Sequence, residues 1–263
     1  MNITNYINWN GSPEIFTFAG FSIGWYGLLF ASGFYLGFHL TQWIFKHENK
    51  DINSLDRFFV YMVVAAIIGG RLGHCIFYAP DYYFANPLEI FKIWHGGLAS
   101  HGGAVGMLLA MYLYAKNSRG ISYLWLLDRM TMPIALGAFF IRLGNFFNSE
   151  VIGIPTTVPW AIIFSRIDLV PRHPSQLYEA LVYLVLFIIL LFIYNKKGKS
   201  IKSGYMMSLL LIIIFTSRFM LEFVKTPQED FLPLYNINMG QWLSLPLIGL
   251  GLYLMFRKSE SLK

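Results

Sequence analysis

The chain has 263 residues, of which 56% are hydrophobic and only 13% are charged, and its mean hydropathy is +0.52. A soluble domain carries about 25% charged residues, and one domain of this length cannot bury so much apolar surface within itself. The composition therefore excludes a soluble enzyme, a disordered chain and a disulfide-bonded secreted scaffold. Cys75 is the only cysteine, so no intramolecular disulfide can form. The net charge of +6 indicates basic cytoplasmic loops of a membrane protein rather than a nucleic-acid partner.

Seven apolar segments each approach the roughly 20 residues that a helix needs to cross a bilayer. They cover residues 15–43, 55–77, 93–115, 123–141, 176–194, 203–224 and 239–256. The first segment does not follow the pattern of a signal peptide, because no Lys or Arg precedes Lys46. We expect an all-α integral membrane protein with seven transmembrane helices. Nothing in the sequence marks a second domain, so residues 1–263 are expected to form a single polytopic transmembrane domain.

Basic residues outside the seven segments predict the orientation. Twelve lysines and arginines follow the first, third, fifth and seventh segments, whereas four lie in the other connections. Because basic loops stay in the cytoplasm, the N-terminus is expected outside and the C-terminus in the cytoplasm. The longest extracytoplasmic connection, residues 143–175, contains Gly153 and four prolines. We expect it to form a structured cap with short strands around residues 160–164.

Polar side chains collect in the outer half of the predicted bundle. Ionisable residues within a membrane are costly and usually functional. This outer layer holds Tyr26, Arg71, His74, His95, His101, Arg142, Asn145, Asn148, Arg172, His173, Gln176, Tyr178, Glu179, Arg218 and Glu222, with Glu150 just beyond it. The inner halves of the later segments carry almost no ionisable side chains. This distribution predicts one polar pocket that opens outward and is too shallow for a channel.

Several of these residues also have a purely structural explanation. Arg218 and Glu222 lie four residues apart and could form a simple ion pair on one helical face. Arg142 could extend to the lipid headgroups, and Tyr26 could belong to the aromatic belt of the interface. Glu150 could be an ordinary loop carboxylate.

A glycine-rich stretch, residues 94–103, surrounds His101. Its four glycines could allow two helices to pack closely, or their N–H groups could approach an anion. Alone, His101 would more often be a packing residue than a catalyst. Arg142 and Arg218 carry guanidinium groups that match a phosphate, and two nearby asparagines add neutral donors. Together these residues predict an anion site at headgroup depth. A histidine metal site is not expected, because no carboxylate or thiolate stands at ligand spacing.

Five motifs follow one another along the chain at residues 69–73, 101–103, 142–150, 172–179 and 217–223. In this order they resemble the signatures of the phosphatidylglycerol–prolipoprotein diacylglyceryl transferase family. The resemblance runs from residue 25 into the last apolar segment, and the stretch RLGNFFNSE at 142–150 is the most specific motif. Ile141 departs from the family pattern, which usually has glycine there, but no polar group is lost. The loop at 226–230 is also less typical.

The resemblance implies a multi-pass enzyme of the bacterial cytoplasmic membrane whose active site faces the outer leaflet. The family transfers the diacylglyceryl group of phosphatidylglycerol to the lipobox cysteine of a prolipoprotein signal peptide. The products are a thioether and glycerol 1-phosphate, in the first step of lipoprotein maturation. The partners implied are therefore membrane lipid and the signal peptide, with no nucleic acid. The substrate supplies the nucleophile, and the chemistry requires no metal and no cofactor.

Roles for individual residues follow from the implied reaction. The substrate thiol must lose its proton before it attacks carbon, and His101 is the expected general base. Arg142 and Arg218 are expected to stabilise the charge that develops on the leaving phosphate. Further residues are expected to orient the arginines, bind the glycerol hydroxyls, position the headgroup or shape the rim of the site: Tyr26, Asn145, Asn148, Glu150, Gly153 and Glu222.

Two other classes of protein are less consistent with the sequence. A transporter or lipid-translocating protein with an anion site predicts polar residues through both leaflets and often internal repeats, and neither is visible. A membrane receptor or scaffold would leave the cluster of histidines and arginines unexplained.

Overall fold

The computed structural model describes residues 6–18, 21–93, 96–226 and 237–257, and most of these residues are helical. The long helices are α1 Trp25–His47, α2 Leu55–Phe77, α4 Ser100–Asn117, α5 Tyr123–Asn148, α6 Ser175–Lys197, α7 Tyr205–Leu221 and α8 Met239–Phe256. Five helical segments of the described chain are long and apolar enough to cross a membrane, namely Ile52–Phe77, Tyr123–Asn148, Ser175–Ser200, Tyr205–Val224 and Met239–Phe256. The chain is therefore a multi-pass membrane protein.

The first and third predicted segments differ most from the observed helices. β2 Glu14–Phe18 and β3 Phe21–Gly24 pair as antiparallel strands, so α1 begins only at Trp25. The short runs FTF at 16–18 and FSI at 21–23 alternate apolar and polar residues, which is typical of strands. The helix predicted from residue 93 begins at Ser100, because Gly96 and Gly97 adopt left-handed φ angles of 81° and 76°.

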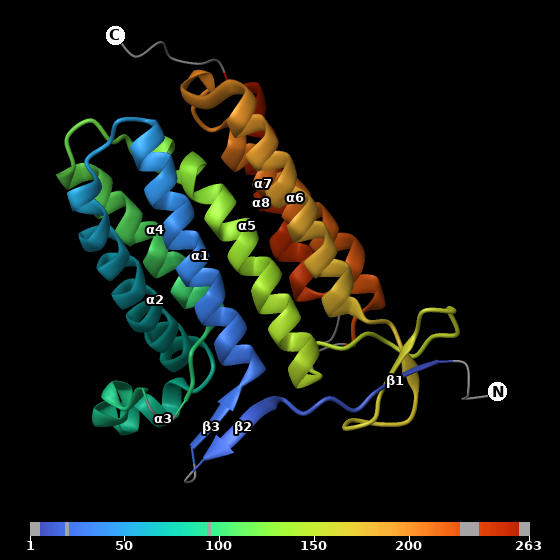
Figure 1. Cartoon of the computed structure of the whole chain (residues 1–263). Helices are drawn as coiled ribbons and strands as arrows, with labels where there is room; N and C mark the ends of the chain where they lie inside the picture. The colour runs from blue at the N-terminus through green and yellow to red at the C-terminus, as the bar shows by residue number, and fades with distance from the viewer. Residues whose placement is uncertain (1–5, 19–20, 94–95, 227–236, 258–263) are drawn as a thin grey trace. The chain divides into compact units, whose positions relative to one another are not determined.

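The chain folds into two compact units, Met1–Thr41 with Asp128–Lys263, and Gln42–Leu127. In the first unit, α7 lies between α6 and α8 and contacts both (Figure 1). In the second unit, α2 and α4 lie side by side along their length (Figure 1). Between them, α3 Pro80–Ala85 and a 3-10 turn at Pro87–Phe91 connect the two helices.

Glycines bring the backbones of α2 and α4 into close contact. A β-carbon on Gly73 would lie 2.8 Å from the Cα of Gly102, and one on Gly106 would overlap the backbone of Ala65. Such an approach is possible only where side chains are absent. The N–H of Gly103 already donates to the carbonyl oxygen of Ala99 at 3.1 Å. Close packing therefore explains these glycines of α4, and the N–H of Gly103 is used within the helix, whereas anion binding by other glycine N–H groups of the stretch stays a prediction.

Arg71 has a structural role in the same unit. Its side chain is only 3% exposed, and its guanidinium donates to the carbonyl oxygens of Ile90 at 2.9 Å and Lys92 at 3.1 Å. It also donates to the carbonyl oxygens of Gly96 and Gly97 and lies 5.0 Å from the ring of Tyr83. Arg71 thus fastens the connection between the two helices to α2.

In the first unit, a carboxylate of α5 caps the start of α7. Asp128 is completely buried and accepts hydrogen bonds from the N–H groups of Gly204 at 2.6 Å and Met207 at 2.9 Å. The first N–H groups of a helix have no partner within that helix. Asp128 satisfies two such donors and thereby ties α5 to α7.

Short strands cover the C-terminal end of α5. β1 Ile7–Trp9 pairs in parallel with β4 Ile162–Phe164, which pairs antiparallel with β5 Pro171–Arg172. The expectation of strands around residues 160–164 is confirmed. The loop predicted from residue 143 begins at residue 149, because α5 continues to Asn148. Its last turns pack beneath the strands, where the ring of Trp9 lies 4.5 Å from Phe146 and 5.5 Å from Phe147.

Gly102→Ala should separate α2 from α4, because the added methyl group would overlap the backbone of Gly69. Overpacking of this kind costs about 1–3 kcal/mol. Thermal unfolding in detergent should show the loss as a lower Tm. Gly249→Ala in α8 is the control, since a β-carbon there meets no atom within 4 Å. Equal Tm values for the two variants would contradict the close packing.

Candidate active site

Eight of the nine site residues predicted from the sequence lie in the first unit. Tyr26 stands at the start of α1, Arg142, Asn145 and Asn148 at the end of α5, Glu150 and Gly153 in the following loop, Arg218 in α7, and Glu222 in the 3-10 turn Glu222–Val224. The ninth, His101, lies in the second unit as the second residue of α4, and its side chain is exposed. His95 and the loop at 227–236 lie outside the described residues.

A chain of hydrogen bonds joins the residues at the end of α5. Arg142 donates through Nη1 to Oδ1 of Asn145 at 3.0 Å, and Asn145 donates through Nδ2 to Oε2 of Glu150 at 3.1 Å. Asn148 donates to the other carboxylate oxygen of Glu150, also at 3.1 Å. Glu150 is therefore the acceptor that orders both amides, and not an ordinary loop carboxylate.

The chain reverses sharply after α5 so that Glu150 can face back to the helix. Ser149 and Val151 adopt left-handed φ angles of 57° and 56°, which are rare for residues with side chains. The start of α6 holds this turn: Ser175 donates to the carbonyl oxygen of Val151 at 2.5 Å, and Gln176 donates to that of Glu150 at 2.6 Å. Strained backbone of this kind persists where surrounding contacts fix it, often at functional sites.

A buried carboxylate on α6 connects two cations. Glu179 is 1% exposed, and its Oε2 lies 2.7 Å from Nε of Arg142. Its Oε1 accepts a hydrogen bond from Nζ of Lys225, also at 2.7 Å, and Lys225 is only 7% exposed. The same ammonium group lies 3.5 Å from Oε2 of Glu222. Since an unpaired buried charge is very costly, these four side chains stabilise one another as a unit.

Arg218 does not pair with Glu222, and the simple ion-pair explanation is wrong for these two described residues. The carboxylate of Glu222 faces Lys225 instead. The charges of Arg218 and Arg142 both act on Tyr183 of α6, which is 5% exposed. Within the described part of the chain, the guanidinium of Arg218 has no hydrogen bond and no ion pair.

Tyr26 belongs to the same cluster. Arg142 and Glu150 both act electrostatically on its phenol group. Its ring lies so close to α5 that a β-carbon on Gly144 would be 2.8 Å from a ring carbon. Tyr26 therefore does more than fill an aromatic belt, because it packs against the helix that carries Arg142.

Gly153 lies where three backbone segments meet. Its N–H donates to the carbonyl oxygen of His173 at 2.9 Å, and its own carbonyl oxygen accepts from Arg172 at 3.2 Å. A β-carbon at this position would lie 2.5 Å from His173 and 2.7 Å from the carbonyl oxygen of Val224. Only glycine fits here, so Gly153 shapes the loop that carries Glu150.

Sequence reasoning missed Lys225, Glu179 and Tyr183 as members of the site. Lys225 counted only as a loop lysine, and Glu179 as one of several polar residues in the outer layer. A helical pattern could have found two of them, because Glu179 and Tyr183 are four residues apart on one face of α6. Lys225 stands three residues after Glu222, a spacing at which two side chains can meet in the helical turn after α7.

The cluster combines three cations with three carboxylates: Arg142, Arg218 and Lys225 with Glu150, Glu179 and Glu222. Carboxylates hold Arg142 and Lys225 in place. The N–H groups of Arg218 have no partner among the described residues and are therefore available to bind another group. Planar guanidinium forks bind phosphate oxygens in pairs. The arrangement can therefore hold a phosphate and stabilise negative charge that grows on it.

Comparisons with known proteins agree with this chemistry. Residues 13–257 match the family model described as prolipoprotein diacylglyceryl transferase. A protein of Chloroherpeton thalassium, named phosphatidylglycerol–prolipoprotein diacylglyceryl transferase, is 48% identical over 98% of this chain and 96% of its own. Proteins with the same name from Tolumonas auensis and Bacteroides fragilis are 44% and 40% identical. They match 96% and 100% of this chain, and 97% and 99% of their own lengths.

Asp168→Asn should weaken the cap in a pH-dependent way. Hydrogen bonds from Arg172 hold the pKa of Asp168 below its ordinary value of 3.8. The pair therefore stabilises the fold fully above that value, and its contribution is lost as the pH falls through the lowered pKa. Unfolding measured from neutral pH downward should show that the variant is less stable than the unaltered protein by a constant amount to about pH 5. This difference in stability should then shrink in more acidic solution. A deficit that does not change with pH would contradict this linkage.

Proposed function

The chain belongs to the prolipoprotein diacylglyceryl transferase family, and we propose that it transfers the diacylglyceryl group of phosphatidylglycerol to the lipobox cysteine of prolipoproteins. The cysteine sulfur forms a bond with the glycerol carbon while the bond between that carbon and a phosphate oxygen breaks. The proton of the thiol is taken up by a base, and glycerol 1-phosphate leaves. The observation that carries the proposal within the structure is the buried ion-pair cluster, in which Glu179 holds Nε of Arg142 at 2.7 Å.

The two arginines are proposed to bind the phosphate of the lipid. Bond cleavage adds negative charge to the leaving oxygen, so donors that are already in place stabilise the transition state more than the ground state. Glu179 fixes Arg142 through Nε at 2.7 Å, and this leaves part of its guanidinium for the lipid. Arg218 has no competing hydrogen bond or ion pair among the described residues.

The remaining members of the cluster are proposed to bind the glycerol headgroup. Among the described residues, none donates a hydrogen bond to the buried Oε2 atom of Glu222, so this atom can accept one from a hydroxyl group. Thr226 carries a buried hydroxyl that also lacks a hydrogen bond within the described part of the chain. Tyr26, Asn145 and Asn148 are proposed to add neutral polar groups that position the headgroup. Lys225 and Glu179 are proposed as positioning residues, because they act through their neighbours.

His101 is proposed as the general base that takes the proton of the substrate thiol. The nucleophile is the thiolate rather than the thiol, and histidine is the side chain that most readily exchanges a proton near neutral pH. Its imidazole lies at the exposed N-terminal end of α4.

We further propose seven membrane spans, with α1 and α4 added to the five more apolar helices. α1 has 23 residues and α4 has 18, which approach the length of a span. The positive-inside rule then places the N-terminus outside and the C-terminus in the cytoplasm. In this topology the ends of α5 and α7 that carry Arg142 and Arg218 face the outer leaflet of the cytoplasmic membrane.

The direct test uses purified protein, phosphatidylglycerol and a lipobox peptide, with the mass of the peptide followed over time. The peptide should gain one diacylglyceryl group, and glycerol 1-phosphate should appear in equal amount. A peptide whose cysteine is replaced by serine is the control and should gain nothing. An unchanged cysteine peptide under conditions where the protein is folded would refute the proposed activity.

Arg218→Lys should fold normally, retain some affinity for phosphatidylglycerol and turn over on the order of 10²-fold more slowly. Lysine keeps the charge but loses the planar fork that matches two phosphate oxygens. The measurement is the kcat of the peptide assay. Arg166→Lys is the matched control, because Arg166 is exposed in the cap and should tolerate the change. Turnover by Arg218→Lys at the rate of the control would remove the fork from the mechanism.

His101→Asn should lose roughly 10²-fold or more of the rate at neutral pH if the imidazole is the base. The remaining activity should rise with pH, since the substrate thiol then ionises without help. A pH profile of kcat for both proteins checks this. Full activity of the variant at neutral pH would show that His101 is not the base.

A further inference from the structure

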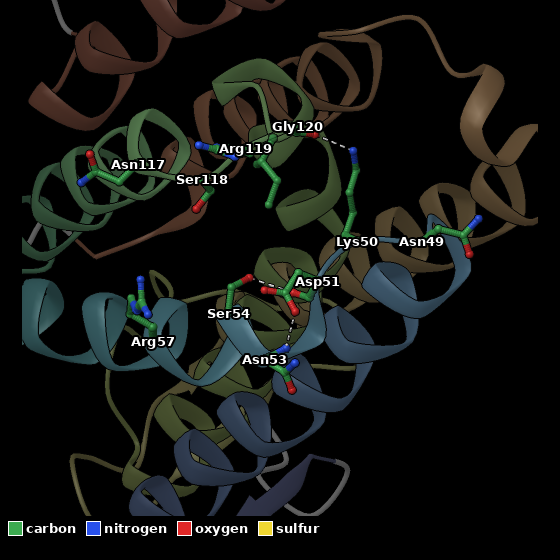
Figure 2. Close-up of a pocket in the computed structure, with 11 residues that line it drawn as sticks. Asn49, Lys50, Asp51, Asn53, Ser54, Arg57, Asn117, Ser118, Arg119 and Gly120 are labelled. Carbon is green, nitrogen blue, oxygen red and sulfur yellow. Dashed lines mark hydrogen bonds between the residues drawn. The ribbon is translucent and has the colours of Figure 1, made fainter.

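A second polar cluster lies in the second unit, at the end of α4 opposite to His101. There a pocket of about 450 Å³ opens between the connection after α1 and the connection after α4 (Figure 2). All its lining residues except Ile121 are polar or glycine. The 18 residues of α4, about 27 Å of helix, separate this pocket from His101. The pocket therefore takes no part in the proposed transfer reaction.

One wall of the pocket is held by hydrogen bonds of its own. Lys50 reaches across the opening and donates to the carbonyl oxygen of Gly120 at 2.5 Å (Figure 2). Its ammonium group also lies 5.1 Å from the ring of Trp125. Asp51, the only acid in the lining, accepts a hydrogen bond from the N–H of Asn53 at 3.0 Å. The lysine and the carboxylate thus maintain the shape of the pocket.

Two arginines in the lining do not help to maintain the shape of the pocket. Arg57 comes from the first turn of α2, and Arg119 from the connection after α4 (Figure 2). Within the residues that the structure describes, neither guanidinium forms a hydrogen bond or an ion pair. With Lys50 and Asp51, the lining carries a net charge of +2. Two unpaired guanidinium groups beside neutral donors such as Ser118 form a setting that favours a phosphate.

We propose that this pocket binds a phosphate group, either on the headgroup of an anionic phospholipid or free in solution. The position favours the lipid. The pocket lies at the start of the membrane-spanning segment Ile52–Phe77, where lipid headgroups meet the protein. Directly along that segment, Val60 is 56% exposed, and Leu113 on α4 is 44% exposed. A lipid bound by its phosphate can therefore lay its acyl chains along apolar side chains.

The test compares two double variants of the full-length protein that lose the same charge. Arg57→Ala with Arg119→Ala empties the pocket of its unpaired cations. Lys46→Ala with Lys116→Ala removes two exposed lysines from the same end of the unit, and neither residue lines the pocket. Each protein is placed in nanodiscs of phosphatidylcholine with a minor fraction of phosphatidylserine. Native mass spectrometry then counts retained phosphatidylserine, and thermal unfolding with inorganic phosphate or chloride tests the soluble source.

The pocket variant should retain phosphatidylserine about tenfold less than the unaltered protein, because each lost contact near the surface weakens lipid binding. The lysine variant should retain about as much phosphatidylserine as the unaltered protein. Both double variants should keep their transferase activity. A rise in Tm with inorganic phosphate that is absent from the pocket variant would support the same site with a soluble ligand.

A second change keeps the test decisive if the arginine variant does not fold. Ser118→Asp leaves both arginines in place but adds a carboxylate to the lining, and it should also lower phosphatidylserine retention. Equal loss in the arginine and lysine variants would mean that general surface charge attracts the lipid, and the proposal would fail. The proposal would also fail if Ser118→Asp retains as much phosphatidylserine as the unaltered protein and inorganic phosphate does not raise the Tm of the unaltered protein.

Discussion

The candidate site depends on one buried carboxylate, that of Glu179. It pairs with Arg142 and Lys225 at the same distance of 2.7 Å, and these cations come from α5 and from the turn after α7. A charge in this position is tolerable only while both partners remain, since burial penalises each ion alone. Without Glu179 two cations would face each other in a poorly hydrated place. The carboxylate therefore fixes the distance between three elements, and with it the position of the guanidinium of Arg142.

The opposite part of α5 is fixed by a second buried carboxylate. Asp128 caps the start of α7, fourteen residues and about 21 Å of helix before Arg142. Because α5 is tied to α7 at one end and to α6 at the other, the arginine stands on a supported helix rather than on a loop. A site held in this way stays close to its productive geometry and needs little reorganisation during a reaction.

Local patterns in the sequence predicted what lies close along the chain. The bounds of α2 and α8 agree with the predicted segments, and the family resemblance drawn from five motifs is confirmed. The contacts of Arg142 with Asn145, and of Asn145 with Glu150, also lie within one short motif. By contrast, Glu179 and Lys225 are 46 residues apart, and no periodicity within one helix predicts their contact.

The alternative of an ion pair between Arg218 and Glu222 fails for a specific physical reason. Their spacing predicts an ion pair only if the helix continues, but α7 ends at Leu221 and a 3-10 turn follows. In that turn the carboxylate of Glu222 faces Lys225 three residues later. The start of α4 was misplaced for a related reason, because the left-handed glycines 96 and 97 lie between the predicted start at residue 93 and the first turn of the helix.

The different pairing of the two arginines suggests different contributions to the proposed reaction. Arg142 is already neutralised by Glu179, so a phosphate must share its guanidinium with a carboxylate. Arg218 has no such partner among the described residues, and its charge is correspondingly costly before a lipid binds. Binding a phosphate relieves that cost, and further charge on the leaving oxygen relieves more of it. We therefore infer that Arg142 mainly positions the headgroup, whereas Arg218 supplies most of the stabilisation that grows as the bond breaks.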